Sequence, residues 1–237
     1  MPSTSRKLVL FDIDGTLISD GGASREAFTE ALAEVYGFRG DVRRYDFSGR
    51  TDPQIARMIL SDDGWNEDDV DARLPALWKH YLSGLARNVP GRVRELPGVR
   101  ALLDAVLANE HLTVALLTGN IEPGARLKLG AMALNDAFRF GAFGSDSPRR
   151  EELPPIAAGR ATELTGHVFH GSDVVIIGDS IYDVRCGLPH GATTIAIASG
   201  KTPAEMLRAE NPHHFFQSAE NLEGIKAAIE GGAMASL

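Results

Sequence analysis

Apolar positions along the chain alternate between two patterns. Four short runs are apolar apart from leading threonines, at residues 8–11, 113–117, 174–177 and 193–197, with a weaker candidate at 138–143. Such runs are typical of strands that are covered on both faces. The segments between them have helical spacing, and several carry a proline near the first turn. They predict helices at about residues 98–109, 123–133, 155–164, 182–190, 203–210 and 222–230.

Alternating strands and helices predict an α/β fold, a doubly wound parallel sheet with helices on both faces. One stretch breaks the alternation, because residues 17–92 contain no convincing buried strand. Apolar spacing in this stretch instead predicts three helices, at about 23–36, 54–60 and 70–86. We therefore expect an α/β core made of residues 1–16 and 93–237, with an inserted helical domain at residues 17–92.

Length and charge narrow the possible partners. The 237 residues are enough for one α/β domain that carries a smaller insert. A net charge of -8 argues against nucleic acid or an anionic membrane as a partner, because both favour basic surfaces. The single cysteine, Cys186, excludes an intramolecular disulfide, and no apolar run has the length of a membrane span. These features favour a cytoplasmic protein.

Acidic residues follow two of the predicted strands. Asp12 and Asp14 come after the first, and Asp179 and Asp183 come after the run at 174–177. In open parallel sheets, ligands bind beyond the carboxyl ends of the strands. Carboxylates held together beside a core are costly unless a cation compensates their charge. We therefore expect one acidic site there, with oxygen ligands suited to Mg²⁺.

Other polar groups are predicted at the same edge of the sheet. Thr118 offers a hydroxyl, and Gly119 and Asn120 offer backbone N–H groups near a helix start, where phosphate binds well. Arg149 and Arg150 follow the weak third strand and could neutralise a phosphate or a carboxylate. Together with the carboxylates, this set fits covalent phosphoryl transfer, in which one carboxylate attacks and another handles protons.

Three segments resemble motifs of the haloacid dehalogenase (HAD) superfamily. Residues 12–17, Asp-Ile-Asp-Gly-Thr-Leu, resemble its first motif, residues 118–120, Thr-Gly-Asn, its second, and residues 178–183, Gly-Asp-Ser-Ile-Tyr-Asp, its fourth. Their order and strand-end context also match, and the resemblance runs from about Lys7 to Ile229. It implies a Rossmann-type core, and it implies that the helical insert is the cap that closes over the site.

The resemblance also implies roles for the acidic residues. Asp12 would be the nucleophile that forms an aspartyl-phosphate. Asp14 would be the general acid and base, and would lend its backbone carbonyl to Mg²⁺. Asp179 would be a direct metal ligand, and Asp183 would support it or a bound water.

A loop in the insert, residues 48–53, resembles a specificity loop of the family. Arg50 or Thr51 would then reach the substrate when the cap closes. Simple capping of the following helix, by Thr51 or Asp52 before Pro53, explains the same residues equally well.

The third motif departs from the family pattern, which usually has a lysine followed by a proline. No lysine lies between Lys128 and Lys201, whereas Arg149 and Arg150 stand at the expected place. We favour Arg150, because it leads directly into the next helix. Lys128 is a lesser candidate, and a solvated helix face is the better interpretation of that residue.

These observations predict a Mg²⁺-dependent phosphatase for a small phosphorylated metabolite, most similar to the phosphoglycolate phosphatase group. A sugar-phosphate mutase similar to β-phosphoglucomutase shares the four motifs, and only Gly15-Thr16 leans toward hydrolysis. A haloacid dehalogenase needs neither Asp14 nor the metal site at Asp179. A non-catalytic binding protein on the same scaffold is the remaining alternative, suggested by the missing lysine.

Overall fold

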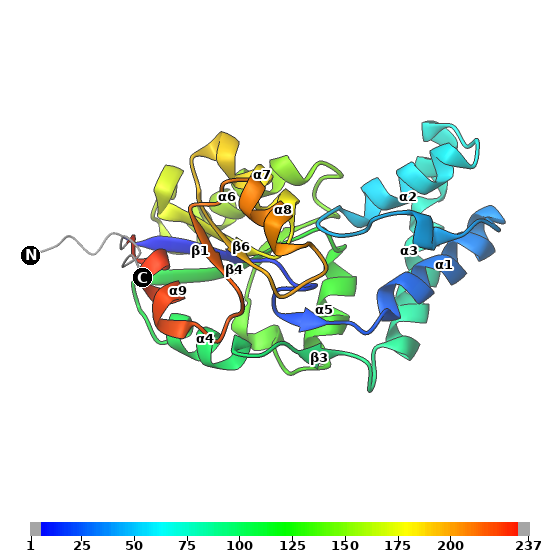
Figure 1. Cartoon of the computed structure of the whole chain (residues 1–237). Helices are drawn as coiled ribbons and strands as arrows, with labels where there is room; N and C mark the ends of the chain where they lie inside the picture. Colours follow the sequence, from blue (N-terminus) through cyan, green and yellow to red (C-terminus); the bar gives the residue numbers. More distant parts are fainter. Residues whose placement is uncertain (1–5, 232–237) are drawn as a thin grey trace, which may run out of the picture.

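The computed structural model describes residues 6–231. Its centre is a six-stranded parallel sheet in the order β5-β4-β1-β6-β7-β8 (Figure 1). The strands of this sheet are β1 Lys7–Phe11, β4 Leu112–Thr118, β5 Gly141–Phe143, β6 Val174–Gly178, β7 Thr193–Ile197 and β8 His214–Phe216. All four continuous apolar runs therefore form strands, as predicted.

Helices cover both faces of this sheet. They are α4 Val99–Leu107, α5 Glu122–Gly130, α6 Leu153–Thr165, α7 Ile181–Gly187, α8 Ala204–Ala209 and α9 Leu222–Ile229. Side chains of α4, α5 and α9 belong to one hydrophobic cluster, and side chains of α6 and α7 belong to a second. The predicted doubly wound α/β fold is confirmed.

Strand β1 lies at the centre of the sheet and separates the two clusters. Val9 and Phe11 pack into the first, whereas Leu8 and Leu10 pack into the second, as the twofold repeat of a strand requires. All four side chains are fully buried. This double burial explains why the strand is continuously apolar in sequence.

The chain order around β1 creates a crevice. From β1 the chain goes to β4 and β5 on one side, and then to β6, β7 and β8 on the other. Such a reversal is the usual binding point of open α/β sheets, since the loops after neighbouring strands diverge there. The loops after β1, β4 and β6 thus meet at one edge.

The helical segment of residues 23–88 lies between two short strands. It consists of α1 Ala23–Tyr36, α2 Asp52–Asp62 and α3 Glu67–Asn88. The antiparallel strands β2 Ile18–Ser19 and β3 Arg94–Glu95 pair where the segment leaves and returns. We did not predict this pair, because two residues are too few to show a pattern.

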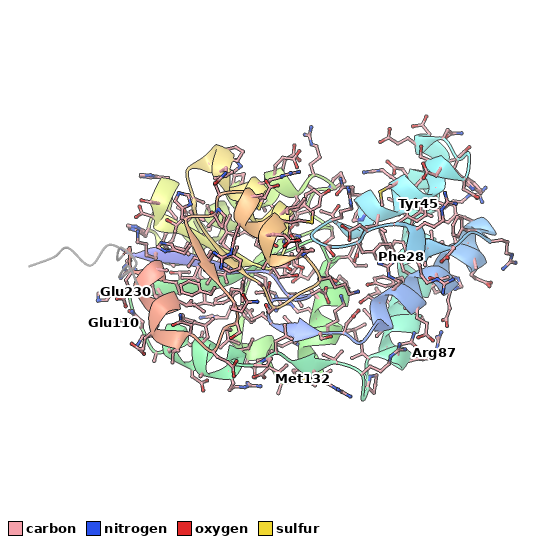
Figure 2. All side chains as sticks on the ribbon, in the orientation of Figure 1. Phe28, Tyr45, Arg87, Glu110, Met132 and Glu230 are labelled. Atoms are coloured by element: carbon pink, nitrogen blue, oxygen red, sulfur yellow. The ribbon has the colours of Figure 1, made fainter. Side chains whose placement is uncertain are left out.

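Helices α1 to α3 lie at the end of the molecule opposite α4 and α9 (Figure 1). Figure 2 labels Phe28 and Tyr45 at this end and Glu110 and Glu230 at the other. The Phe28 ring packs edge-on against the rings of Tyr81 and Phe47, with centroids 5.3 and 5.7 Å apart. Aromatic packing therefore holds the helical segment together.

Two features limit other interpretations of the chain. Within residues 6–231, no helix is long and apolar enough to cross a membrane. Cys186 is buried on α7, and burial raises the pKa of its thiol to about 12. The thiol is therefore a packed side chain and not a reactive one.

Candidate active site

A tight turn after β1 presents the first two acidic residues. The Asp12 backbone N–H still bonds to the Ile177 carbonyl at 3.0 Å, so Asp12 continues the ladder between β1 and β6. Gly15 then adopts a left-handed conformation with φ 88°. A Cβ at this glycine would also overlap the Asp179 carboxylate. Glycine is therefore required both for the turn and for the close approach of the two loops.

Asp12, Asp179 and Asp183 form a buried acidic cluster. One carboxylate oxygen from each lies within 4.8 Å of the others. Thr16 donates a hydrogen bond of 3.1 Å to Asp179 Oδ1. Burial raises the pKa of Asp12 and of Asp179 above the ordinary range, and the neighbouring carboxylates raise both further. The cluster thus carries more negative charge than its surroundings solvate.

Arg150 is the cation that faces this cluster. Its Nη2 donates to Asp12 Oδ1 at 3.0 Å and also to Asp183 Oδ1, and its Nη1 donates to the Gly49 carbonyl at 3.0 Å. Burial lowers the pKa of the guanidinium, but Asp183 and Asp12 outweigh that effect and hold it above the usual range. Arg149 instead faces solvent and pairs with Glu152. The structure therefore puts Arg150, and not Arg149, beside the acidic residues.

The donor set fits a divalent cation. Three buried carboxylates face one guanidinium, so negative charge remains in excess, and carboxylate oxygens are the ligands that Mg²⁺ prefers. Both oxygens of Asp183 are already engaged, Oδ1 by Arg150 and Oδ2 by Ser180. Asp12 and Asp179 therefore have the greater capacity to bind a metal, while Asp183 also caps α7.

The loop after β4 brings a second set of polar groups to the same pocket. Thr118 is fully buried, and its Oγ1 accepts hydrogen bonds from the Asn120 side-chain Nδ2 at 2.8 Å and from the Asn120 backbone N–H at 3.3 Å. Asn120 Nδ2 also donates to Asp14 Oδ2 at 2.8 Å. This loop therefore contacts the turn after β1 directly.

Lys128 requires a correction. The sequence favours a solvated helix face, but the residue is 1% exposed. Its Nζ lies 2.6 Å from Asp14 Oδ2 and 2.6 Å from Asn120 Oδ1. The prediction was wrong because Asp14 is 114 residues away and Asn120 lies in the loop before α5, and nothing in the spacing of α5 itself reveals either partner.

The loop before α2 is fastened to the edge of the sheet. The Asp52 backbone N–H donates to the Gly119 carbonyl at 2.7 Å, and Asp52 Oδ2 accepts from the Ile121 N–H at 2.9 Å. The Thr51 hydroxyl donates to the Pro148 carbonyl at 2.7 Å and accepts from the Gln54 N–H at 3.2 Å. Thr51 therefore caps α2 and links the loop to the core.

Arg50 has a different environment. It lines the pocket that also contains Asp12 and Asp14, whereas Thr51 lies outside that lining. Its guanidinium stands 5.0 Å from the centroid of the Tyr182 ring. Its Nε is buried without a hydrogen-bond partner in the part of the chain that the structure describes. Of the two candidates in this loop, only Arg50 has a free donor beside the pocket.

The loop after β7 also contributes to the site, which we did not predict from the sequence. Ser199 Oγ donates to the Gly15 carbonyl at 2.7 Å, and Gly200 lies so close to Asp179 that a Cβ would overlap its carboxylate. Both residues line the pocket with Lys201. The strand-end argument could have found them, because the run at 193–197 was recognised as a strand.

Comparisons with known proteins agree with this geometry. The family model described as haloacid dehalogenase-like hydrolase matches residues 9–187, and a second, HAD-hydrolase-like model matches residues 155–222. Among curated proteins, the phosphoglycolate phosphatase of Rhodobacter capsulatus is 26% identical over 226 residues, which is 94% of this chain and 96% of the relative.

Solved structures share the fold. A hydrolase from Pseudomonas syringae superposes with a TM-score of 0.71 at 18% identity, over 97% of this chain and all of the other. A candidate β-phosphoglucomutase from Bacteroides vulgatus has a TM-score of 0.66 at 20% identity, over 97% and 91% of the two chains. With the acidic cluster at the strand ends and the family match over residues 9–187, the chain belongs to the haloacid dehalogenase-like hydrolase family.

Proposed function

We propose that the protein is a Mg²⁺-dependent phosphatase that hydrolyses a small phosphorylated metabolite through an aspartyl-phosphate on Asp12. One observation carries the proposal. Asp12 lies in the same pocket as Asp14, Thr118 and Arg150, with Asp179 beside it. This pocket therefore combines a nucleophile, a second carboxyl group, hydrogen-bond donors and metal ligands.

In the first step, an Asp12 carboxylate oxygen attacks the phosphorus of the substrate. The bond between phosphorus and the ester oxygen breaks, and its electron pair goes to that oxygen. Asp14, in its protonated form, donates the proton that the departing alkoxide needs. Arg150 holds Asp12 Oδ1, while no hydrogen bond from the described residues occupies Oδ2, which supports Oδ2 as the attacking atom.

In the second step, water attacks the phosphorus of the aspartyl-phosphate. Asp14, now ionised, takes a proton from this water, and the bond between phosphorus and the Asp12 oxygen breaks. Inorganic phosphate and the free Asp12 carboxylate result. Thr118, together with the backbone N–H of Gly119, would stabilise the phosphoryl oxygens during both steps.

Mg²⁺ would be held by the side chains of Asp12 and Asp179 and by the backbone carbonyl of Asp14, with Asp183 as a support. When bound, it would neutralise the charge of the phosphoryl group and orient one of its oxygens. The clustering of buried carboxylates supports this assignment, since Arg150 alone leaves them with excess negative charge.

We propose that residues 17–92 act as a cap over a core made of residues 1–16 and 93–237. The hydrogen bonds that Asp52 makes with Gly119 and Ile121 support a closed position of the cap loop. Arg50 would then contact the part of the substrate that lies beyond the phosphate, as its unpartnered Nε suggests.

The substrate proposal rests on the curated relatives. They include phosphoglycolate phosphatases, so a small phosphorylated acid such as 2-phosphoglycolate is the first candidate. Arg50 and Lys201 on the pocket wall would suit a second anionic group. With a net charge of -8 and one buried thiol, we propose a cytoplasmic enzyme without a nucleic-acid or membrane partner.

The alternatives explain less of the pocket. A dehalogenase would use Asp12 but no metal, which leaves the metal-binding arrangement around Asp179 without a role. A binding protein does not need Asp14 beside Asp12. A mutase shares all these residues, and its likeness at 20% identity bears on the fold alone. The substrate must therefore be tested with a mutase control.

The first prediction concerns the metal and the substrate. We expect the purified protein to hydrolyse p-nitrophenyl phosphate with Mg²⁺, and to lose this activity when a chelator removes the metal. In a panel of phosphorylated metabolites, phosphate release should be fastest with a small phosphorylated acid. Asp12→Asn should show no turnover while it retains the circular dichroism spectrum of the wild type.

Full activity in chelator would contradict the metal assignment. The panel of metabolites also includes glucose 1-phosphate, and a coupled assay detects any glucose 6-phosphate that forms from it. Isomerisation that is faster than phosphate release would replace the phosphatase proposal with a mutase.

The second prediction separates the two arginines. Arg150→Ala leaves Asp12 and Asp183 without their cation, so kcat/KM should fall by about 100-fold or more. Arg149→Ala removes only an exposed pair with Glu152, and kcat/KM should stay within about threefold of the wild type. Arg150→Lys restores the family's usual residue and should keep part of the activity. Equal losses in the two alanine variants would contradict the role of Arg150.

The third prediction tests the docked loop. Gly119→Ala places a methyl group against the Arg50 carbonyl, so the loop before α2 must move away from the pocket. We expect kcat/KM to fall by about tenfold or more. Gly159→Ala is the matched control, because nothing lies within 4 Å of its Cβ position. This control should keep normal kinetics and gain about 0.5–1 kcal/mol of stability, since alanine favours a helix interior. Normal kinetics in Gly119→Ala would show that the loop position is irrelevant to turnover.

A further inference from the structure

Lys128 is the buried charge that the proposed reaction does not yet use. It lies on α5, the helix that follows the Thr118 loop, and is 1% exposed. A buried ammonium is costly unless it is paired and hydrogen-bonded. Its partners are Asp14 Oδ2 and Asn120 Oδ1, both at 2.6 Å. The pairing therefore joins the helix to the proposed proton carrier.

The first consequence concerns the orientation of the Asn120 amide. A lysine ammonium only donates hydrogen bonds, so the oxygen of the amide must face Lys128. The amide nitrogen then faces the other way, where it donates to Asp14 Oδ2 and to Thr118 Oγ1, each at 2.8 Å. Lys128 thus determines which end of Asn120 faces the pocket residues.

The second consequence concerns Thr118. Its Oγ1 accepts hydrogen bonds from Asn120, and a hydroxyl also has one proton to donate. In its hydrogen bond with the amide nitrogen of Asn120, Thr118 Oγ1 is the acceptor. The hydroxyl proton of Thr118 therefore remains available for another acceptor. The order of donation, from Lys128 to Asn120 to Thr118, prepares this hydroxyl to donate to a phosphoryl oxygen.

The third consequence concerns Asp14. Its Oδ2 accepts from two donors, Lys128 and Asn120, while its Oδ1 has no partner among the described residues. Two donors on one oxygen fix the rotation of the carboxyl group. Loss of Lys128 would remove one of them and also release the Asn120 amide that provides the other.

Groups of the helical segment also favour the charged form of Lys128. Burial lowers the pKa of the ammonium, but Asp14, Tyr81, Asp20 and Asp52 outweigh it and hold the pKa above its usual range. Tyr81 and Asp52 belong to α3 and α2, and Asp20 lies three residues before the start of α1. The residue therefore stays an ammonium where the helical segment meets the core.

We propose that Lys128 is a positioning residue that orients Asp14 for proton transfer and, through Asn120, sets Thr118 to donate to the phosphoryl group. The inference rests on the proposed function, because it assigns a role in the same reaction. It differs from direct substrate binding, in which the ammonium would contact the phosphate itself and its loss would raise KM.

The test compares two phosphate esters with different leaving groups in Lys128→Met. An alkyl phosphate needs the proton from Asp14, whereas p-nitrophenolate leaves readily without it. General acid catalysis contributes about 10²–10⁴-fold, so kcat/KM for the alkyl phosphate should fall by about 100-fold. For p-nitrophenyl phosphate, the loss of kcat/KM should be less than about tenfold, and KM should not rise. Lys226→Met, at a half-exposed lysine of α9, is the matched control and should match the wild type.

Equal losses with both esters, or a loss that lies in KM alone, would overturn the positioning role. If Lys128→Met does not fold, Lys128→Gln serves instead, because it can still donate one hydrogen bond; it should show the same dependence on the leaving group. The Asp14→Asn variant completes a double-mutant cycle. Adding Lys128→Met to it should cost little more, since both substitutions disable one proton carrier.

A crystal structure of Lys128→Met separates this inference from the proposed function. A rotated Asp14 carboxyl and a changed Asn120 amide contact are expected. If both keep their wild-type hydrogen bonds, the positioning role is wrong, whatever the enzyme hydrolyses. If the wild type hydrolyses neither ester with Mg²⁺, the proposed function fails, and the crystal structure still decides whether Lys128 orients the two side chains.

Discussion

Buried negative charge at the ends of β1 and β6 is the constraint on which the site depends. Asp12, Asp179 and Asp183 are each at most 5% exposed, and their carboxylates converge within 4.8 Å. Such a group is stable only with positive charge nearby. Arg150 supplies one charge, and a bound Mg²⁺ would supply the rest. The glycines of the surrounding loops allow this convergence, because a side chain at Gly15 or Gly200 would overlap Asp179.

The same interactions connect the helical segment to the core. Arg150 bonds to the Gly49 carbonyl as well as to Asp12, and Asp52 bonds to the loop after β4. Lys128 has a corresponding place on the other side of Asp14, near Asp52 of α2 and Tyr81 of α3. Arg150 and Lys128, the two cations that balance the negative charge of the pocket, thus also lie next to the helical segment. A change in the position of that segment would therefore alter the surroundings of both cations.

Strands β1, β4, β6 and β7 and most helices could be predicted because burial leaves a local pattern. The acidic residues could be located because strand ends meet at one edge. Arg150 was predicted from its place before α6, and the structure puts it beside Asp12.

Lys128 could not be predicted. On α5 it stands between Leu127 and Leu129, and it is more deeply buried than the apolar Leu127. Its burial depends on Asp14, which is 114 residues away, and no local periodicity contains that information. The β2–β3 pair was missed for a simpler reason, its length of two residues on each strand.

The most direct test of the account is to trap the phosphoenzyme. The protein is mixed with Mg²⁺ and a phosphate ester that it hydrolyses, quenched rapidly in acid, digested and analysed by mass spectrometry. The account predicts one added phosphoryl group on the peptide that contains Asp12, with the label on Asp12 and not on Asp14, and its disappearance when turnover is complete. Turnover without any phosphoenzyme, or with the phosphoryl group on a different residue, would contradict the assignment of Asp12 as the nucleophile.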